Sequence, residues 1–166
     1  MRRRSLVIAA MIILTLALAT LALAADPFVG TWKLNVAKSK VSDPGMMPKS
    51  EIFKAEALDN GIKRAYEGVE ANGKAYKTVV SARYDEKDYP VTGGVLDPVT
   101  GSSFVDTEAL KKIDATAFEY VDKKAGKEVA IGRVAVSKDG KTLTHTLKVT
   151  NPKGLDLKAT WIYDKQ

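Results

Sequence analysis

Residues 28–40, FVGTWKLNVAKSK, contain the pattern that decides the fold class of this chain. Alternate residues fall on two faces, as expected for a β-strand whose two faces differ. One face carries Gly30, Trp32, Leu34 and Val36, and the other carries Val29, Thr31, Lys33 and Asn35. Trp32 can bury ~150–250 Å² and close one end of a sheet that curls on itself. Gly30 has no side chain, so it lets another chain segment approach closely. We therefore interpret Gly30 and Trp32 as a structural plug.

Similar alternation continues beyond this segment and is divided by turn signals. Asn60-Gly61, Asn72-Gly73, Ala125-Gly126 and Asp139-Gly140 each fit a tight hairpin, which needs positive φ angles. We predict strands over 28–36, 50–58, 61–69, 74–84, 88–92, 104–113, 117–123, 127–137, 141–150 and 155–164.

These sequential strands with short connections predict an all-β, antiparallel up-and-down meander. One wide sheet would leave two exposed edges, whereas closure of eight to ten strands into a β-barrel removes both. A sandwich is the alternative all-β answer. The short local turns favour the barrel, since a sandwich needs longer connections between its sheets.

The first 24 residues predict a signal peptide. Three arginines precede an uncharged apolar run, and Ala22-Leu23-Ala24 provides small residues for cleavage. The alternative is a retained membrane anchor. We expect one domain over 25–166, located in the periplasm or secreted, with no stable membrane span after cleavage.

Composition limits the partners and the chemistry of this chain. Three of its 26 basic side chains, and none of its 20 acidic ones, lie in the leader, so the remaining net charge is +3. Without clustered basic residues, we expect no nucleic-acid partner. One histidine and no cysteine predict no metal site and no cofactor. No catalytic constellation is visible, so we predict a protein that is not an enzyme.

Two segments interrupt the strand pattern. Residues 37–49 contain two prolines and a glycine and predict a loop with one helical turn. Residues 92–103 contain three glycines and a proline. We interpret the second segment either as a flap over the mouth of the barrel or as a long connection.

The first strand also supports a resemblance to a known family. Gly30-Thr31-Trp32 resembles the G-x-W signature of the lipocalin and calycin barrels. The segments 28–40, 84–93 and 137–144 are similar to small secreted bacterial proteins with lipocalin-like domains, a group of uncharacterised function. The resemblance implies an antiparallel barrel of eight to ten strands. Lipocalins commonly pack a late arginine over the tryptophan, but here Arg133 is the last arginine and Lys158 and Lys165 follow it.

Polar residues in the predicted strands are the candidate ligand-binding residues. They are Arg64, Tyr66, Tyr76, Tyr84, Tyr120 and His145. Arg64 is in phase with Tyr66, and if that face is internal, a bound carboxylate can pair with the guanidinium. In the opposite phase Arg64 lies in water. The phase of Arg133 is also open, because a one-residue slip in the turn at Asp139-Gly140 reverses every side chain.

Two functions follow from the predicted barrel. The first is an exported monomer that binds a small hydrophobic or amphiphilic molecule inside the barrel, where aromatic residues and a few polar groups would line the cavity. The alternative is a filled β-barrel that acts as a structural or protein-interaction module of the cell envelope. An interior cavity above roughly 300 Å³ would favour the first function.

Overall fold

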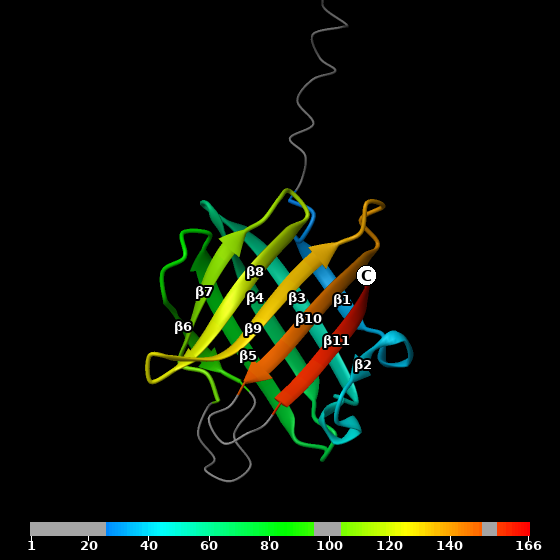
Figure 1. Ribbon diagram of the computed structural model, residues 1–166. Helices are drawn as coiled ribbons and strands as arrows, with labels where there is room; N and C mark the ends of the chain where they lie inside the picture. Colours follow the sequence, from blue (N-terminus) through cyan, green and yellow to red (C-terminus); the bar gives the residue numbers. More distant parts are fainter. Residues whose placement is uncertain (1–25, 95–103, 151–155) are drawn as a thin grey trace, which may run out of the picture.

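The computed structural model describes residues 26–94, 104–150 and 156–166, and these residues form an all-β domain (Figure 1). Their strands are β1 (Gly30–Leu34), β2 (Lys40–Val41), β3 (Ser50–Leu58), β4 (Gly61–Val69), β5 (Ala75–Arg83), β6 (Tyr89–Gly93), β7 (Thr107–Lys112), β8 (Ala117–Lys124), β9 (Lys127–Val136), β10 (Thr142–Thr150) and β11 (Asp156–Lys165). Two short 3₁₀ helices, η1 (Val36–Lys38) and η2 (Pro44–Met46), flank β2.

Ten of the eleven strands in the described residues close into an antiparallel barrel, as the sequence predicted. Strand order follows the chain from β3 to β11, and β1 pairs with both β3 and β11. At the closure, Trp32 lies opposite Lys165 on one side and Phe53 on the other. In Figure 1 the first strand, in blue, and the last strand, in red, lie beside each other.

The segment between the first two barrel strands contains more structure than the predicted loop. Its 3₁₀ helices correspond to the expected helical turn, but β2 was not predicted. Val41 and Lys40 of β2 pair with Ala159 and Thr160 of β11. A two-residue strand shows too little alternation for recognition in the sequence, and it forms because β11 offers an unpaired edge beyond β1. The predicted flap at 92–103 lies mostly outside the described residues.

Apolar side chains close one end of the barrel. The fully buried members of this plug are Phe28, Trp32, Ile62, Phe118 and Leu143. Trp32 donates a 2.8 Å hydrogen bond from its indole N–H to the carbonyl of Phe28. The Lys165 ammonium lies 4.9 Å from the centre of the Trp32 ring. A lysine thus covers the tryptophan where lipocalins commonly use an arginine.

Gly30 is adapted to this closure. Its φ of +134° favours glycine, and a Cβ at this position would lie 3.3 Å from Cε of Lys165. The glycine therefore allows the lysine side chain to pass over the first strand toward Trp32.

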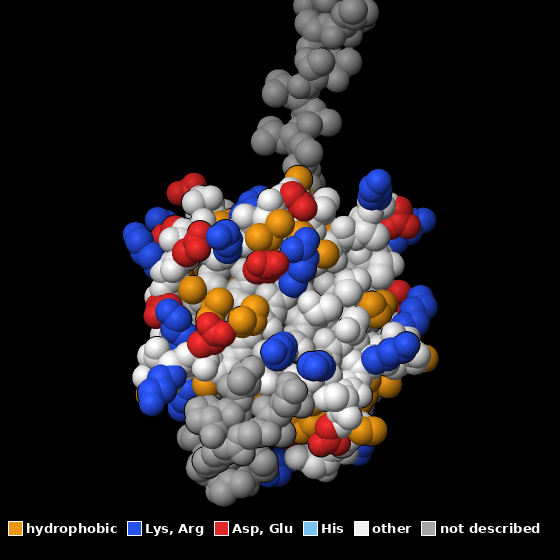
Figure 2. Space-filling model, in the orientation of Figure 1, with side chains coloured by type: hydrophobic (Ala, Val, Ile, Leu, Met, Phe, Trp, Pro, Cys, Tyr) orange, Lys and Arg blue, Asp and Glu red, His pale blue; other side chains and the backbone are white. Residues whose placement is uncertain are grey.

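The outer surface is charged and mixed. In Figure 2, basic and acidic side chains alternate over the visible face, together with scattered apolar groups. Among the described residues, none belongs to a helix long and apolar enough to cross a bilayer.

Candidate functional site

A buried ion pair lies at the centre of the barrel interior. Alternation along β4 turns Ile62, Arg64 and Tyr66 inward, and Arg64 is only 1% exposed. Its Nη2 contacts the carboxylate of Glu108 on β7, and its Nη1 donates a 3.1 Å hydrogen bond to the Tyr66 hydroxyl. The phase left open by the sequence is thus the inward one. The guanidinium already has a carboxylate partner from the protein itself, so the expected ligand carboxylate is not needed to neutralise it.

Aromatic rings enclose the Arg64 guanidinium. Its Cζ lies 5.1 Å from the centre of the Phe118 ring, 5.4 Å from Tyr120 and 5.9 Å from Tyr66. Burial lowers the pKa of Arg64, but the Glu108 carboxylate, together with Tyr66 and Tyr120, raises it by more in total, so the net pKa lies above the ordinary value. The side chain therefore remains a cation fixed in an aromatic cage.

Tyr120 and His145 form the second polar pair of the interior. The Tyr120 hydroxyl lies 2.5 Å from Nε2 of His145. Burial lowers the pKa of His145 to about 3, with a smaller contribution from Arg64, and burial raises the pKa of Tyr120. Both groups are therefore neutral at physiological pH. We assign the Tyr120 hydroxyl as the donor to Nε2, because its proton has no other acceptor among the described residues. This assignment leaves the imidazole proton on Nδ1.

Gly132 makes room for the Tyr120 ring. These residues lie directly opposite each other on β8 and β9, and a Cβ at position 132 would overlap the ring and its hydroxyl. A glycine is needed here because only a bare backbone lets the tyrosine lie flat across the neighbouring strand and reach His145.

A second carboxyl group faces Glu108. Asp122 of β8 lies opposite Glu108 of β7, and alternation places both on the inner face. Burial raises the pKa of Asp122 to about 8; the Glu108 carboxylate raises it further and Arg64 opposes the change. Asp122 is therefore mainly protonated at neutral pH, so it is a hydrogen-bond donor rather than a counter-ion.

Glu51 organises a third group of polar side chains. It accepts hydrogen bonds from the hydroxyls of Tyr76 and Tyr163. Burial raises the pKa of Glu51, and the two hydrogen bonds partly offset this. Tyr76 lies opposite Gly68, where a Cβ would be 2.8 Å from the tyrosine oxygen. Gly68 thus makes room for Tyr76, just as Gly132 makes room for Tyr120.

Several interior polar atoms have no hydrogen-bond partner among the described residues. They are Arg64 Nε, Tyr84 Oη, His145 Nδ1 and Trp161 Nε1. His145 and Trp161 lie opposite each other on β10 and β11, and their rings are tilted by 47° with centroids 5.0 Å apart. Arg64 belongs to the same cluster, because Tyr66 and Tyr120 contact both Arg64 and His145. Unpartnered buried donors are rare in folded proteins, so this cluster is the strongest candidate for a ligand site.

All six predicted binding residues lie on the inner face or pack against the core. Four of them form one cluster: Arg64, Tyr66, Tyr120 and His145. Tyr76 belongs instead to the Glu51 group, while Tyr84 packs on Phe118 in the apolar plug, 5.8 Å between ring centres.

The sequence analysis did not identify Glu51, Glu108, Asp122 or Trp161 as site residues. The alternation in 155–163 does place Trp161 inward, beside Tyr163. For Glu108 the only signal is its phase with Leu110, and a lone glutamate in a strand is normally solvated. Its burial is explained by Arg64, which is 44 positions away in the sequence.

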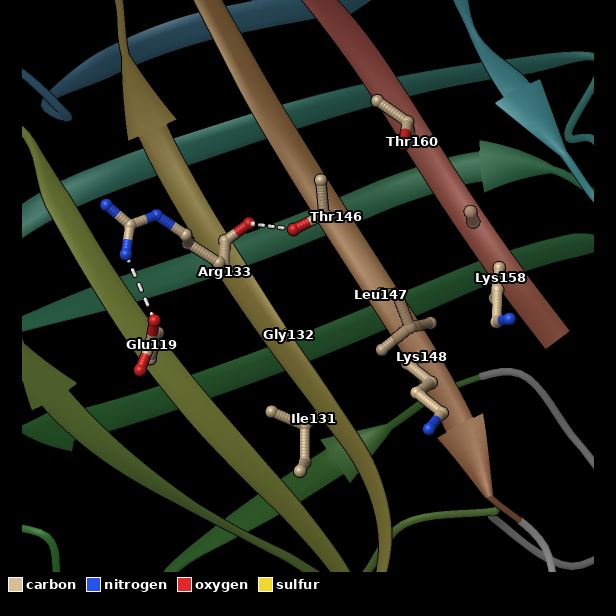
Figure 3. A pocket seen from close by; sticks show the side chains of 10 residues that line it. Glu119, Ile131, Gly132, Arg133, Thr146, Leu147, Lys148, Lys158 and Thr160 are labelled. Carbon is tan, nitrogen blue, oxygen red and sulfur yellow. Dashed lines mark hydrogen bonds and ion pairs between the residues drawn. The ribbon is translucent and has the colours of Figure 1, made fainter. Parts of the chain in front are cut away.

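The described residues also form a groove on the outer face of the barrel (Figure 3). It has a volume of about 370 Å³, and its lining includes Ile131, Arg133, Thr146, Lys148 and Lys158. Arg133 points outward and pairs with Glu119 at 3.0 Å, which answers the phase question left open by the sequence. Val134 and Val136 lie opposite His145 and Leu143 instead.

The described residues contain no candidate metal site. Within residues 26–94, 104–150 and 156–166, no three His, Cys, Asp or Glu side chains are arranged to hold a metal ion.

Comparison with known proteins adds no family assignment. No protein-family model matches this chain, and no curated protein shows significant similarity to it. The closed barrel of ten antiparallel strands is consistent with a calycin-like fold. Membership of the lipocalins and export from the cytoplasm remain predictions from the sequence.

Proposed function

We propose that this protein binds a small amphiphilic molecule inside its barrel, as an exported lipocalin-like protein. One observation carries the proposal: Arg64 Nε, His145 Nδ1 and Trp161 Nε1 lie buried in the interior without a hydrogen-bond partner among the described residues. An unpartnered buried donor costs roughly 1–3 kcal/mol, and a ligand that accepts hydrogen bonds recovers this free energy. The aromatic rings beside these donors supply apolar contact for the rest of the molecule.

The interior changes in character along the barrel axis. Phe28, Trp32 and Phe118 fill one end completely. Toward the other end, Thr78 and Tyr76 of β5 are only half-buried. We infer that a ligand enters at this second end and reaches the donor cluster with its polar group, while the plug blocks the first end.

Titration with N-phenyl-1-naphthylamine, a neutral probe whose fluorescence rises in apolar surroundings, tests this function. We expect saturable binding by the wild-type protein. Thr78→Trp adds bulk to the inner face and should abolish binding, whereas Val79→Trp adds the same bulk to the outer face and should leave binding unchanged. Absence of saturable binding by the wild-type protein, or equal effects of the two variants, would contradict the proposal.

The outer groove favours a second candidate function, that of an interaction module. Ile131 is 46% exposed beside Lys148 and Lys158, and these lysines lie directly opposite each other on β10 and β11 (Figure 3). Like charges in this arrangement repel, so an anionic partner would relieve them. Replacement of both lysines by glutamine should abolish capture of such a partner without altering uptake of the neutral probe.

A further inference from the structure

We propose that the ligand of the barrel is uncharged and carries an oxygen acceptor, such as a carbonyl or an ester, that binds the N–H groups of Arg64, His145 and Trp161. This inference rests on the binding function proposed above and specifies the class of ligand. Two features of the interior carry it. They are the balance of buried charges and the set of buried polar groups that have no hydrogen-bond partner among the described residues.

The charge balance argues against an anionic ligand. Arg64 is a buried cation, and Glu108 already contacts it as a buried counter-ion. A carboxylate ligand would place a second negative charge beside Glu108, in surroundings where repulsion is poorly screened. The ligand would also lose its hydration without gaining an unpaired cation.

The free groups argue against a cationic ligand. A protonated amine is only a donor, and it would need an unoccupied acceptor. The Glu51 carboxylate already receives two tyrosine hydroxyls, and Glu108 already receives Arg64. Asp122 faces the interior, but burial raises its pKa to about 8, so it carries its proton at pH 7.

The unpartnered atoms of the Arg64, His145 and Trp161 cluster are nitrogen donors and suit an acceptor oxygen. With Tyr120 assigned as the donor to Nε2, His145 carries its proton on Nδ1, and the centre of the Trp161 indole ring lies 5.0 Å from the centre of this imidazole. Cζ of Arg64 lies 5.4 Å from the centre of the Tyr120 ring, and its Nε has no hydrogen-bond partner among the described residues. A carbonyl oxygen has two lone pairs and can accept from two such donors at once.

Four molecules with a ten-carbon chain separate the possibilities at pH 7. These molecules are methyl decanoate, decanoate, decylamine and decane, and each competes with the neutral probe for the intact protein. We expect methyl decanoate to bind about tenfold more tightly than the other three, since each hydrogen bond to a buried donor contributes about a factor of ten. Equal or tighter binding of decanoate or decylamine would overturn the inference while leaving the binding function intact. Failure of all four to compete, with the probe itself unbound, would overturn both.

A single substitution tests the role of the indole N–H. Trp161→Phe keeps an aromatic ring and should weaken methyl decanoate binding about tenfold, with little change for decane. Ile162→Val, at the next and outward-facing position, should change neither affinity. An equal loss for both molecules in Trp161→Phe would show a packing role and contradict the proposed hydrogen bond. If that variant does not fold, the preference of the wild-type protein among the four molecules still decides.

Discussion

Arg64 on β4 and Glu108 on β7 form an ion pair inside the barrel, although 44 positions separate them in the sequence. Neither side chain would be stable there alone, because an unpaired charge in an apolar interior is strongly disfavoured. Arg64 of this pair also donates to the Tyr66 hydroxyl and lies over the Tyr120 ring, so the pair links the aromatic residues of the candidate site.

Breaking this pair should destabilise the fold strongly. Glu108→Ala leaves the guanidinium buried and unpaired, and we expect a loss of about 3–5 kcal/mol in the free energy of unfolding. Arg64→Met combined with Glu108→Leu removes both charges and should restore much of the loss. Denaturant unfolding measures both effects. The matched control is Glu119→Ala, which breaks the outer ion pair with Arg133 and should cost at most about 1 kcal/mol. Similar losses from Glu108→Ala and Glu119→Ala would show that the inner pair is hydrated.

Gly132→Ala should destabilise the barrel through Tyr120. The added methyl group overlaps the tyrosine ring, so either the ring or the β9 backbone must move. We expect a loss of about 1–3 kcal/mol in the free energy of unfolding, which is typical of overpacking. In a Tyr120→Ala background the methyl group meets no ring, and the same change should then cost much less. An additive double-mutant cycle would contradict the close contact between these two positions.

The sequence was sufficient for the architecture because the pattern is local and repeated. The predicted strand 50–58 and the predicted strand 61–69 have the observed limits, and Asn60 between them has the positive φ angle expected of the turn. The first strand was predicted too long, since the chain leaves the sheet at Asn35, whose side chain caps the first 3₁₀ helix. Alternation alone does not mark where pairing with β11 ends.

The candidate site was harder to predict because its parts come from distant strands. Arg64 could be assigned to a face only through neighbours in the fold, and its partner Glu108 gives no local signal. The direction of Arg133 depended on the turn after β9, where Ser137 and Thr142 enclose four residues. An even number of residues in that turn keeps Val134 and Val136 on the inner face, as a two-residue turn would have done.

Asp122 should make the protein less stable as the pH rises. Its folded pKa of about 8 lies above the ordinary value of 3.8, so the native state retains a proton that the unfolded chain releases. Between these values the free energy of unfolding falls with increasing pH, by at most about 1.4 kcal/mol per unit. From pH 6.5 to 8 the unfolded chain also releases the remaining proton of the single histidine, but this contribution is common to the wild-type protein and Asp122→Asn, so the difference between their curves reports Asp122. We expect Asp122→Asn to flatten the curve measured by denaturant unfolding in this window; an unchanged slope would place Asp122 in water.

His145 should have the opposite effect at lower pH. Its folded pKa of about 3 lies below the ordinary value of 6.5, so only the unfolded state gains a proton between these values. The stability of the wild-type protein relative to His145→Gln should therefore fall as the pH drops from 6.5 to 4. Thermal unfolding of both proteins across this range measures the difference. A difference that stays constant with pH would contradict a buried neutral imidazole.

The most direct measurement of the central claim is a crystal structure of the protein grown with N-phenyl-1-naphthylamine. The account predicts electron density for the probe inside the barrel, in contact with Trp161 and Tyr66 and away from the Trp32 plug. Probe density confined to the outer groove over β9 and β10, with side chains filling the interior completely, would contradict it.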